Sequence, residues 1–369
     1  MAPDGDGFLA KRAVEELRLK SVLTLLGWLV VAVTIMPLLR FGSWWIRIFD
    51  FPRAHIAVTA ALTALLLPLA ETPPTFAAWI LLFALAASVF IQAYWIYPYT
   101  MLVAPEVQNN RHSAAEVRLM IANILITNRQ FPRLANYVAQ YDPDMLLVLE
   151  TNEWWARQLQ SLDPRFPYKV SHPLENAYGI SLHSKLDLVD TEIRFLVQDD
   201  IPSIRTKVKL NERCVVEFYG VHPRPPTPPE HDRSTERDAE LILIGRECET
   251  SKRPVIVAGD LNDVAWSYGT LRFRKISRLL DPRIGRGFFG TFHAKLPFFR
   301  WPLDHVFHSD HFRLVDMKVL PQFGSDHLPV FVHLSYERDA EFTQKEPERP
   351  SSEEREEAQE VVEEAQKSN

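Results

Sequence analysis

Three stretches in the first hundred residues carry no Asp, Glu, Lys or Arg, and they constrain the fold more than any other feature. They are Ser21–Leu39, His55–Ala70 and Phe76–Tyr97. The first and third are long enough to cross about 30 Å of hydrocarbon as helices, and Trp and Tyr residues gather at the ends of the stretches as in an aromatic belt. The middle stretch is short and contains Pro68, so a buried helical hairpin is its alternative. We predict about three transmembrane helices within residues 21–100, after an N-terminal polar segment of residues 1–20.

The basic residues around the first stretch indicate a topology. Four of them precede it and three follow it in the first loop: Lys11, Arg12, Arg18 and Lys20, then Arg40, Arg47 and Arg53. Because basic residues favour the cytoplasmic side, this count favours a cytoplasmic N-terminus by a small margin. With three passes, the C-terminal part of this multi-pass cell-membrane protein then lies outside the cytoplasm. The first stretch lacks a small-residue cleavage site, so we do not interpret it as a cleaved signal peptide.

After the third stretch, residues 101–116 are polar and are predicted to form a linker. From Val117 to Tyr336 short apolar runs alternate with helical patterns, which favours two sheets packed face to face with helices outside. The predicted strands are Arg118–Ile126, Met145–Leu149, Gly179–Leu182, Lys185–Val189, Ile204–Leu210, Cys214–Val221, Val255–Ala258, Asp304–His308, Phe312–Val319 and Val330–Leu334. The predicted helices are Phe131–Tyr141, Trp154–Leu162, Ser234–Thr250 and Leu271–Arg278.

Charge and cysteine content limit the class of partner. Residues 337–369 hold twelve acidic and five basic residues, so the remaining chain is close to neutral although the net charge is −6. This acidic tail has few apolar residues and is predicted to be disordered or a solvated helix. The near-neutral charge of the chain outside this tail argues against tight binding of duplex nucleic acid. The two cysteines, Cys214 and Cys248, form no CxxC motif and indicate neither a zinc site nor a disulfide-dependent fold.

Polar side chains stand at or just past the ends of several apolar runs. Glu150 ends the run 145–149, where an ionised carboxylate needs a partner, and Mg²⁺ is a suitable one. A surface glutamate paired with an arginine is the alternative. Asn123 supplies a neutral amide oxygen that could bind the cation or orient a neighbouring group. An ordinary strand-edge asparagine is the alternative. Asp260 and Asn262 follow the run 255–259, and their i, i+2 spacing places both on one side, unless they only form a turn.

A second group of polar residues lies nearer the C-terminus. Asp326 and His327 stand together after a Gly-Ser turn, and this pair can bind a hard cation and exchange protons. Asp304 follows Trp-Pro-Leu, and His222 follows Tyr-Gly-Val. A capped turn is the alternative for the Asp-His pair, and a structural Val-His-Pro turn is the alternative for His222.

These motifs resemble the endonuclease/exonuclease/phosphatase superfamily, also called DNase-I-like, over Val117–Tyr336. The resemblance rests on five motifs in order: Asn123, Glu150, Gly259-Asp260-Leu261-Asn262, Asp304 and Ser325-Asp326-His327. It implies an α/β fold of four layers, in which two mixed β-sheets are covered by outer helices. It also implies a metal-dependent phosphodiesterase or phosphomonoesterase.

The resemblance assigns a role to each residue. Glu150, Asn123 and Asp326 would hold Mg²⁺ or Mn²⁺, and Leu125 stands where some members have a second acidic ligand, which favours one ion. The catalytic roles would fall to Asp260 (activation of water), Asn262 (holding phosphate or water), His327 (contact with the scissile phosphate), Asp304 (orientation of that histidine) and His222 (neutralising the phosphate or protonating the leaving group). Tyr178 stands where some members contact the phosphate, or it only packs. Arg224 and Arg237 are candidate phosphate donors or surface residues.

The sequence therefore predicts a membrane-anchored, metal-dependent phosphoesterase, with the bilayer as a partner and no identifiable protein partner. Its substrate would be nucleic acid or a phospholipid head group. We find no inserted basic, aromatic-rich loop of the kind that would hold an abasic duplex. The alternative, from a different class, is a catalytically silent membrane-bound scaffold with the same fold.

Overall fold

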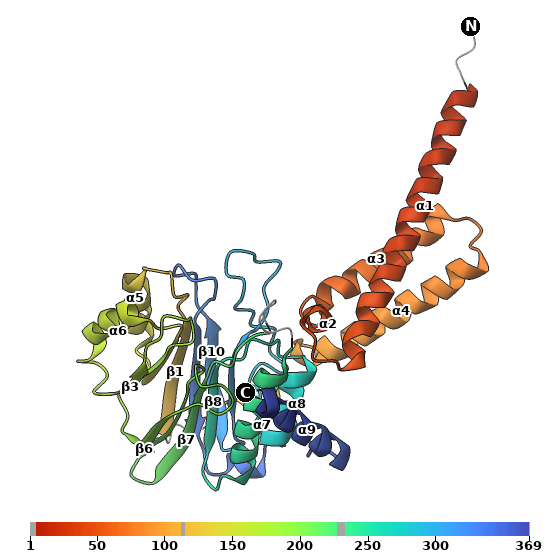
Figure 1. The fold of residues 1–369 in the computed structure, drawn as a ribbon. Coiled ribbons are helices and arrows are strands. Elements are labelled where there is room, and N and C mark those ends of the chain that lie inside the picture. Colours follow the sequence, from red (N-terminus) through yellow and green to blue (C-terminus); the bar gives the residue numbers. More distant parts are fainter. Residues whose placement is uncertain (1–4, 112–114, 227–232, 369) are drawn as a thin grey trace. The chain divides into compact units, whose positions relative to one another are not determined.

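The chain forms two compact units, Met1–Pro98 and Tyr99–Asn369. The computed structural model describes residues 5–111, 115–226 and 233–368. Residues 1–4 of the predicted polar segment and residues 112–114 of the predicted linker lie outside the described residues. Figure 1 shows the helices of the first unit and the sheets of the second.

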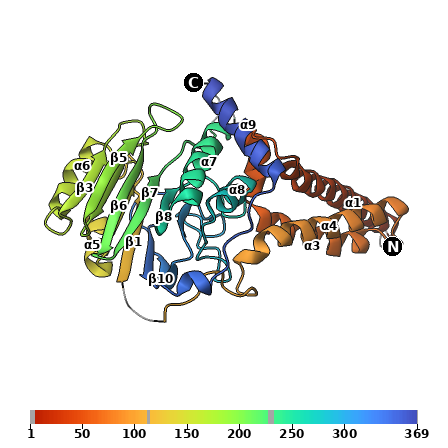
Figure 2. The ribbon, with the colours of Figure 1, turned by 90° about the horizontal axis from the view of Figure 1, so that it is seen from below.

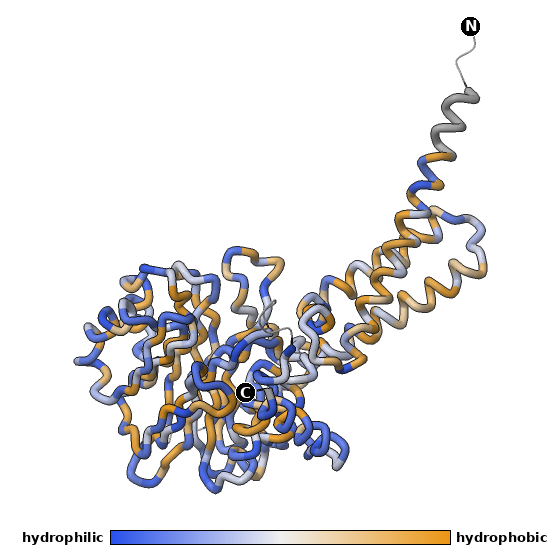
Figure 3. Tube along the Cα trace, viewed as in Figure 1, coloured by the Kyte–Doolittle hydropathy of each residue, from blue (hydrophilic) through white to orange (hydrophobic). Residues whose placement is uncertain are grey.

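The first unit is helical. Its long helices are α1 (Gly5–Ile35), α3 (Arg53–Ala70) and α4 (Phe76–Ile96), with a short α2 (Trp44–Arg47) between the first two. Three segments are long and apolar enough to cross a membrane: Val14–Leu39, Arg53–Ala70 and Phe76–Tyr99. Figure 3 shows hydrophobic residues along most of these helices. The three charge-free stretches of the sequence therefore lie in three separate helices, and α1 also extends into the segment predicted as polar.

The three long helices pack through apolar side chains. Leu23, Ile56, Leu81 and Leu85 belong to one buried cluster that joins α1, α3 and α4. Polar groups in this unit find partners, as the amide of Gln92 in α4 donates to the hydroxyl oxygen of Thr34 in α1 at 3.2 Å. A satisfied polar group of this kind is what an apolar surrounding requires.

The second unit contains two mixed sheets. The six-stranded sheet has the order β10 (Phe312–Val319), β11 (Val330–Tyr336), β1 (Ala115–Asn123), β2 (Met145–Leu149), β4 (Ile180–Ser184) and β3 (Tyr168–His172). The five-stranded sheet has the order β5 (Leu188–Arg194), β6 (Ser203–Asn211), β7 (Cys214–Val221), β8 (Val255–Asp260) and β9 (Asp304–His308). In each sheet one pair of strands is parallel, β1 with β2 and β7 with β8.

Helices cover both outer faces of the sandwich. Side chains from both sheets, such as Leu147 and Phe218, form the core between them. On the outside of the six-stranded sheet lie α5 (Phe131–Tyr141) and α6 (Glu153–Leu159). On the outside of the five-stranded sheet lie α7 (Thr235–Thr250) and α8 (Tyr268–Ser277). Figure 2 shows this order of layers, which confirms the predicted four-layer α/β sandwich.

Several strands differ from the sequence prediction, among them β5, which spans Leu188–Arg194 in place of the predicted Lys185–Val189. β3 was not predicted, because it is an edge strand with one apolar residue, Val170, and largely exposed side chains. β1 ends at Asn123, three residues before the predicted end, because the chain turns there and Leu125 adopts a φ of 56°. Buried, continuously apolar strands such as β2 were predicted with the observed bounds.

The segment predicted as a linker packs on the sandwich. Val107 is fully buried in the core between the sheets. The carboxylate of Glu106 pairs with the guanidinium of Arg274 in α8 at 2.6 Å. The described part of residues 101–116 is therefore an integral part of the second unit.

The acidic tail was predicted to be disordered or a solvated helix, and the structure has a helix with one buried face. Residues Ser352–Ser368 form α9. Ala358, Val362 and Ala365 are buried in a cluster with Ile242 of α7. Their spacing places the three side chains on one face of the helix, while the acidic residues occupy the other faces. The narrow apolar stripe is sufficient to pack a helix that is otherwise strongly charged.

Candidate active site

Strand pairing in the six-stranded sheet brings three predicted site residues to one edge. Asn123 lies opposite Leu149 in the parallel pair β1 and β2, so Glu150 follows beside it. β11 runs antiparallel to β1 and pairs Val330 with Ile121. His327 therefore enters β11 at the edge where β1 and β2 end.

The five-stranded sheet contributes residues at the corresponding edge. β7 and β8 are parallel and pair Val221 with Gly259, so His222 and Asp260 follow side by side. β9 is antiparallel and pairs Asp304 with Asp260. The site is therefore built where strands of both sheets end, and hydrogen bonds connect the two sheets there.

A glycine is required next to Asp260. Gly259 has a φ of 152°, and a Cβ atom at this position would lie 1.8 Å from the backbone oxygen of Val221. Only glycine allows β8 to approach β7 so closely. The close backbone approach at Gly259 is thus made to the neighbouring strand, and it fixes the position of the carboxylate that follows.

Asp260 lies at the centre of the polar cluster and is fully buried. Its carboxylate accepts hydrogen bonds from the amide of Asn123 at 3.0 Å and from the backbone N–H of Asn262 at 2.8 Å. Nε2 of His327 lies 3.5 Å from Oδ2, and Nε2 of His222 lies 4.0 Å from it. Burial raises the pKa of Asp260, although the charge of His327 opposes this effect.

His327 is held between two carboxylates. Its Nδ1 lies 2.8 Å from Oδ2 of Asp304. Burial by itself would lower the pKa of His327, but Asp304 and Asp260 outweigh it and raise the pKa to about 10. The imidazole is therefore a cation near neutral pH, which favours the role of charge stabiliser over that of base.

Glu150 and Asp326 form a second acidic grouping. Glu150 adopts a φ of 64°, and its carboxylate accepts a hydrogen bond from the backbone N–H of Ile126 at 3.0 Å. Burial raises its pKa, and the negative charge of Asp326 acts in the same direction. Within the described ranges neither carboxylate pairs with a lysine or arginine. Two carboxylates with no lysine or arginine partner in these ranges suit a hard divalent cation.

A different grouping also has the spacing of a metal site. Ligand atoms of Asp260, Asp304 and His327 lie within 4.8 Å of one another. However, both ring nitrogens of His327 face carboxylates, and a protonated imidazole has no lone pair for a metal. We therefore interpret this grouping as an ion-paired chain and regard Glu150 with Asp326 as the better cation site. Asn123 lies between the two groupings, because its amide donates to Asp260 at 3.0 Å and its side chain also lowers the pKa of Glu150.

His222 and Tyr178 lie beside the central carboxylate. Their ring centroids are 5.6 Å apart, and the guanidinium of Arg224 lies 5.2 Å above the Tyr178 ring. His222 is 3% exposed, and burial lowers its pKa, so its imidazole is neutral. Its Nδ1 makes no hydrogen bond with any part of the chain that the structure describes. Such a buried, unsatisfied nitrogen is suited to a group that the substrate brings.

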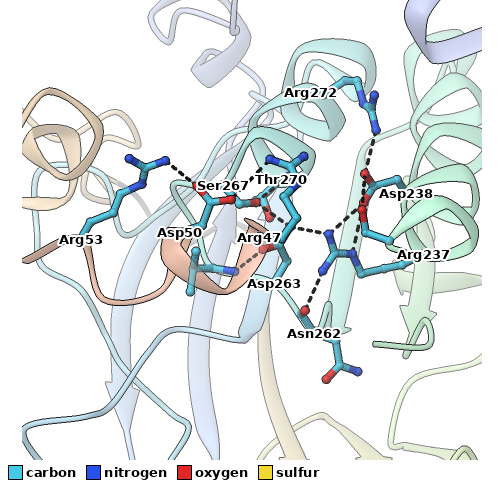
Figure 4. Close-up of polar contacts among 12 residues, drawn as sticks. Arg47, Asp50, Arg53, Arg237, Asp238, Asn262, Asp263, Ser267, Thr270 and Arg272 are labelled. Carbon is cyan, nitrogen blue, oxygen red and sulfur yellow. Dashed lines mark hydrogen bonds and ion pairs between the residues drawn. The ribbon is translucent and has the colours of Figure 1, made fainter. Parts of the chain in front are cut away.

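Arg237 supports the site from behind and does not lie on the surface. Its guanidinium donates to the backbone oxygen of Asn262 at 2.9 Å and pairs with Asp238 at 3.0 Å (Figure 4). Arg272 pairs with the same aspartate at 3.0 Å. The side chain of Asn262 donates to the backbone oxygen of Pro223 at 3.0 Å. The loop after β8 is therefore fixed by buried charge pairs, and the prediction of a surface or phosphate-binding Arg237 is wrong.

Two features of the site were missed in the sequence. The hydroxyl of Ser325 donates to the backbone oxygen of Asn123 at 2.8 Å and accepts from the N–H of His327 at 3.0 Å, so it ties the Asp-His pair to β1. Residues 288–301 form a loop with five phenylalanines and one tryptophan next to the site, and we assigned this loop no role from the sequence. The Phe292 ring centroid lies 5.0 Å from that of His327. A run of aromatic residues between two site motifs was the signal that could have identified it.

The family model of the Endonuclease/Exonuclease/phosphatase family matches residues 120–327. The chain belongs to this family. The match begins in β1 and ends at His327, so it includes every predicted site residue. The chain is accordingly a hydrolase that acts on phosphate esters, in a family that depends on divalent metal ions.

Solved structures show the same fold at low sequence identity. TDP2 from D. rerio, in complex with a single-strand DNA product, is 14% identical with a TM-score of 0.51, over 60% of this chain and all of that one. A family protein from Bacteroides thetaiotaomicron is 17% identical with a TM-score of 0.50, over 62% of this chain and all of that one. Comparison with curated proteins finds no match to the sequence. The likeness to these structures concerns the fold alone.

Proposed function

We propose that this protein is a membrane-anchored phosphoesterase that hydrolyses a phosphate ester with one divalent cation, Mg²⁺ or Mn²⁺, at the edge of the sandwich. The observation that carries the proposal is the arrangement around Asp260. One buried carboxylate lies between two imidazoles, 3.5 Å and 4.0 Å away, and shares Asn123 with an acidic grouping that suits a cation. A catalytically silent scaffold would have no need to bury so many ionisable groups together.

Glu150 and Asp326 hold the cation in this proposal, and Asn123 orients the first of them. The bound cation would neutralise charge on the phosphate oxygens. The positive φ of Glu150 and its hydrogen bond from Ile126 direct its carboxylate toward the site. The distortion of the backbone at this position is the kind of strain that persists where a functional group must be aimed.

Asp260 and Asn262 prepare the attacking water. Because burial raises the pKa of Asp260, its carboxylate is a stronger base than a surface aspartate and can accept a proton from water. The backbone N–H of Asn262 donates to Oδ1 of Asp260 at 2.8 Å. Together with the hydrogen bond from Asn123 to Oδ2, this contact fixes the orientation of the carboxylate.

The two histidines act on the phosphate. His327, kept charged by Asp304, stabilises the negative charge that develops on the phosphate oxygens. His222 is neutral, and its Nδ1 has no hydrogen-bond partner among the described residues. It can therefore donate a hydrogen bond to the phosphate or to the leaving group through whichever nitrogen carries the proton. Tyr178 packs against His222 and limits the space on that side.

The helical unit anchors the enzyme in the cell membrane by three passes, as the three long apolar helices support. The count of basic residues around the first span favours a catalytic unit outside the cytoplasm. An enzyme of this kind would meet its substrate at or near the membrane surface.

Hydrolysis by the purified full chain tests the proposal. The substrates are single-stranded DNA, plasmid DNA, phosphoinositide vesicles and sphingomyelin vesicles, each with Mg²⁺, Mn²⁺ or EDTA. We expect hydrolysis of at least one class, abolished by EDTA and by Asp260→Ala. Glu192→Ala, at an exposed carboxylate of β5 in the same unit, is the matched control and should remain active. If the folded, metal-loaded chain hydrolyses none of them, the scaffold interpretation replaces this proposal.

A further inference from the structure

The aromatic loop, residues 288–301, exposes apolar side chains at its tip. Phe298 is 84% exposed, and Leu296 and Phe299 are each 50% exposed. Lys295 and Pro297 are also exposed, so the tip combines apolar groups with a positive charge. The loop stands out from the sandwich (Figure 1). Side chains of this size are normally buried, and a cluster of exposed ones indicates a contact surface.

The loop is ordered although its tip is exposed. The backbone N–H groups of Thr291 and Phe292 donate to the backbone oxygen of Trp301 at 2.9 Å and 3.0 Å, which closes the base as a hairpin. At the tip, the N–H of Phe299 donates to the oxygen of Leu296 at 2.9 Å. The exposed side chains are therefore presented by a fixed backbone, and little ordering entropy would be lost when they bind.

The base of the loop is attached to the active site. The N–H of Ala294 donates to the backbone oxygen of Asp326 at 2.7 Å, and the N–H of Leu328 donates to the oxygen of Thr291 at 3.0 Å. The hydroxyl of Thr291 accepts from the N–H of Asp304 at 3.3 Å. Hydrogen bonds therefore join the base of the loop directly to the segments that carry Asp304, Asp326 and His327.

We propose that the aromatic loop inserts its tip into the surface of a lipid bilayer, and that the phosphate ester hydrolysed is in the head group of a lipid. The inference rests on the proposed function and narrows its substrate class. Leu296, Phe298 and Phe299 would enter the acyl boundary, while Lys295 would remain at the level of the phosphates. An apolar tip beside a basic residue is the composition that binds an anionic membrane surface.

The short connection between the third candidate span and the catalytic unit supports a bilayer as the partner. The catalytic unit begins at Tyr99, the residue at which the third candidate span ends. With no further linker between them, the unit stays within reach of the bilayer in which the helices are embedded, at a high effective concentration. Weak insertion by two or three side chains is then sufficient to keep the site at the surface.

Single-stranded nucleic acid is the other partner that exposed aromatic rings could bind, by stacking on bases. It is less consistent with the loop for two reasons. Leu296 offers no aromatic face, and the chain apart from its acidic tail is close to neutral, which gives little attraction for a polyanion. Binding of nucleic acid by the loop is therefore an outcome that the experiment must be able to reveal.

Contact with lipid can be measured without reference to activity. The full chain carrying Phe298→Cys or Phe342→Cys is labelled with a fluorophore and reconstituted in vesicles of phosphatidylcholine and phosphatidylglycerol that contain a spin-labelled lipid. Both native cysteines are buried, so the label is directed to the new one. Phe342 is the matched control, because it is 81% exposed and follows β11 at the end away from His327. We expect lipid quenching at position 298 and none at position 342, and equal signals at both positions would overturn the proposal.

Activity provides the second readout. In the double variant Leu296→Ser/Phe298→Ser, we expect hydrolysis of phosphoinositide or sphingomyelin vesicles to fall about tenfold or more, because two apolar side chains no longer enter the bilayer. Hydrolysis of a water-soluble phosphodiester, bis(p-nitrophenyl) phosphate, should stay unchanged, and Phe342→Ser should change neither.

The remaining outcomes separate the two proposals. If the double variant loses hydrolysis of single-stranded DNA and keeps that of lipid, the loop binds nucleic acid and this inference is wrong. If soluble esters are hydrolysed but lipid vesicles are not, the inference fails while the proposed function stands. If the wild-type chain hydrolyses no phosphate ester, the proposed function fails, and with it the lipid substrate.

Discussion

Replacing Asp304 by asparagine removes the charge that holds His327 while it preserves the size of the side chain. In the native protein, Nδ1 of His327 lies 2.8 Å from Oδ2 of Asp304, and the aspartate is 2% exposed. Asparagine can still accept one hydrogen bond from the imidazole. The substitution therefore tests the charge and not the packing.

The size of the effect follows from the distances. Two unit charges 2.8 Å apart attract with about 6 kcal/mol at an effective dielectric constant of about 20. Asp260, whose Oδ2 lies 3.5 Å from Nε2, supplies about 5 kcal/mol on the same scale. Asp304→Asn thus removes about half of the attraction that keeps the imidazole charged. Because desolvation offsets part of the direct attraction, we expect a net loss of about 3 kcal/mol, which is about 100-fold in turnover if the cation acts in the transition state.

Two measurements check this prediction in the full chain. Turnover should fall about 100-fold with little change in KM, and the pKa of His327, followed by NMR of labelled imidazole, should fall from its native value of about 10. Asp187→Asn is the control, since that aspartate pairs with Lys209 at 3.2 Å on the surface, where ion pairs contribute little. If Asp304→Asn lowers the pKa but leaves turnover unchanged, the charge of His327 has no part in catalysis, and the reasoning is refuted.

Two further substitutions probe the folding of the catalytic unit. Gly259→Ala should destabilise the unit by about 3 kcal/mol or more, because the Cβ of the alanine would lie 1.8 Å from the backbone oxygen of Val221. An unchanged thermal midpoint would show that β7 and β8 do not approach so closely. Glu240 is buried in α7, and burial raises its pKa to about 8. A carboxyl whose pKa is raised on folding favours the folded state at low pH, and this contribution is lost as the pH rises from about 4.5 to about 8. Glu240→Gln should remove this pH dependence, so the stability of the variant relative to the native protein should grow by about 1.4 kcal/mol per pH unit in that range. Thermal midpoints of the full chain in detergent at pH 5 and pH 8 measure this difference in stability. A difference that stays constant would contradict a buried Glu240 with a raised pKa.

The layers of the fold follow from the sequence because buried strands leave a strong pattern. β2 and β7 are short apolar runs bounded by polar residues, and both were predicted with the observed bounds. β3 leaves no such pattern, since as an edge strand it exposes most of its side chains and its pairing is decided by β4. The packing of α9 was underestimated because three small or β-branched residues carry it in a strongly acidic sequence.

The residues that meet at this edge of the sandwich could be named from the sequence, because polar side chains follow strand ends in a characteristic order. The distances and hydrogen bonds among these residues could not be predicted from the sequence. The bridge of Asn123 between Asp260 and Glu150 depends on how the two sheets face each other, which no local pattern encodes. The burial of Arg237 likewise depends on Asp238 and on the loop at Asn262, so an arginine that looks like a surface residue becomes a support of the site.

The most direct test of the central claim is a titration of the metal-free full chain with Mn²⁺, in which bound metal is followed by electron paramagnetic resonance and turnover is measured at each concentration. We expect turnover to rise in proportion to the occupancy of one site. We also expect Glu150→Gln to weaken Mn²⁺ binding and to shift both curves together to higher concentration. Turnover that is complete without metal, or metal binding that Glu150→Gln leaves unchanged, would contradict the assignment of the cation to this edge of the sandwich.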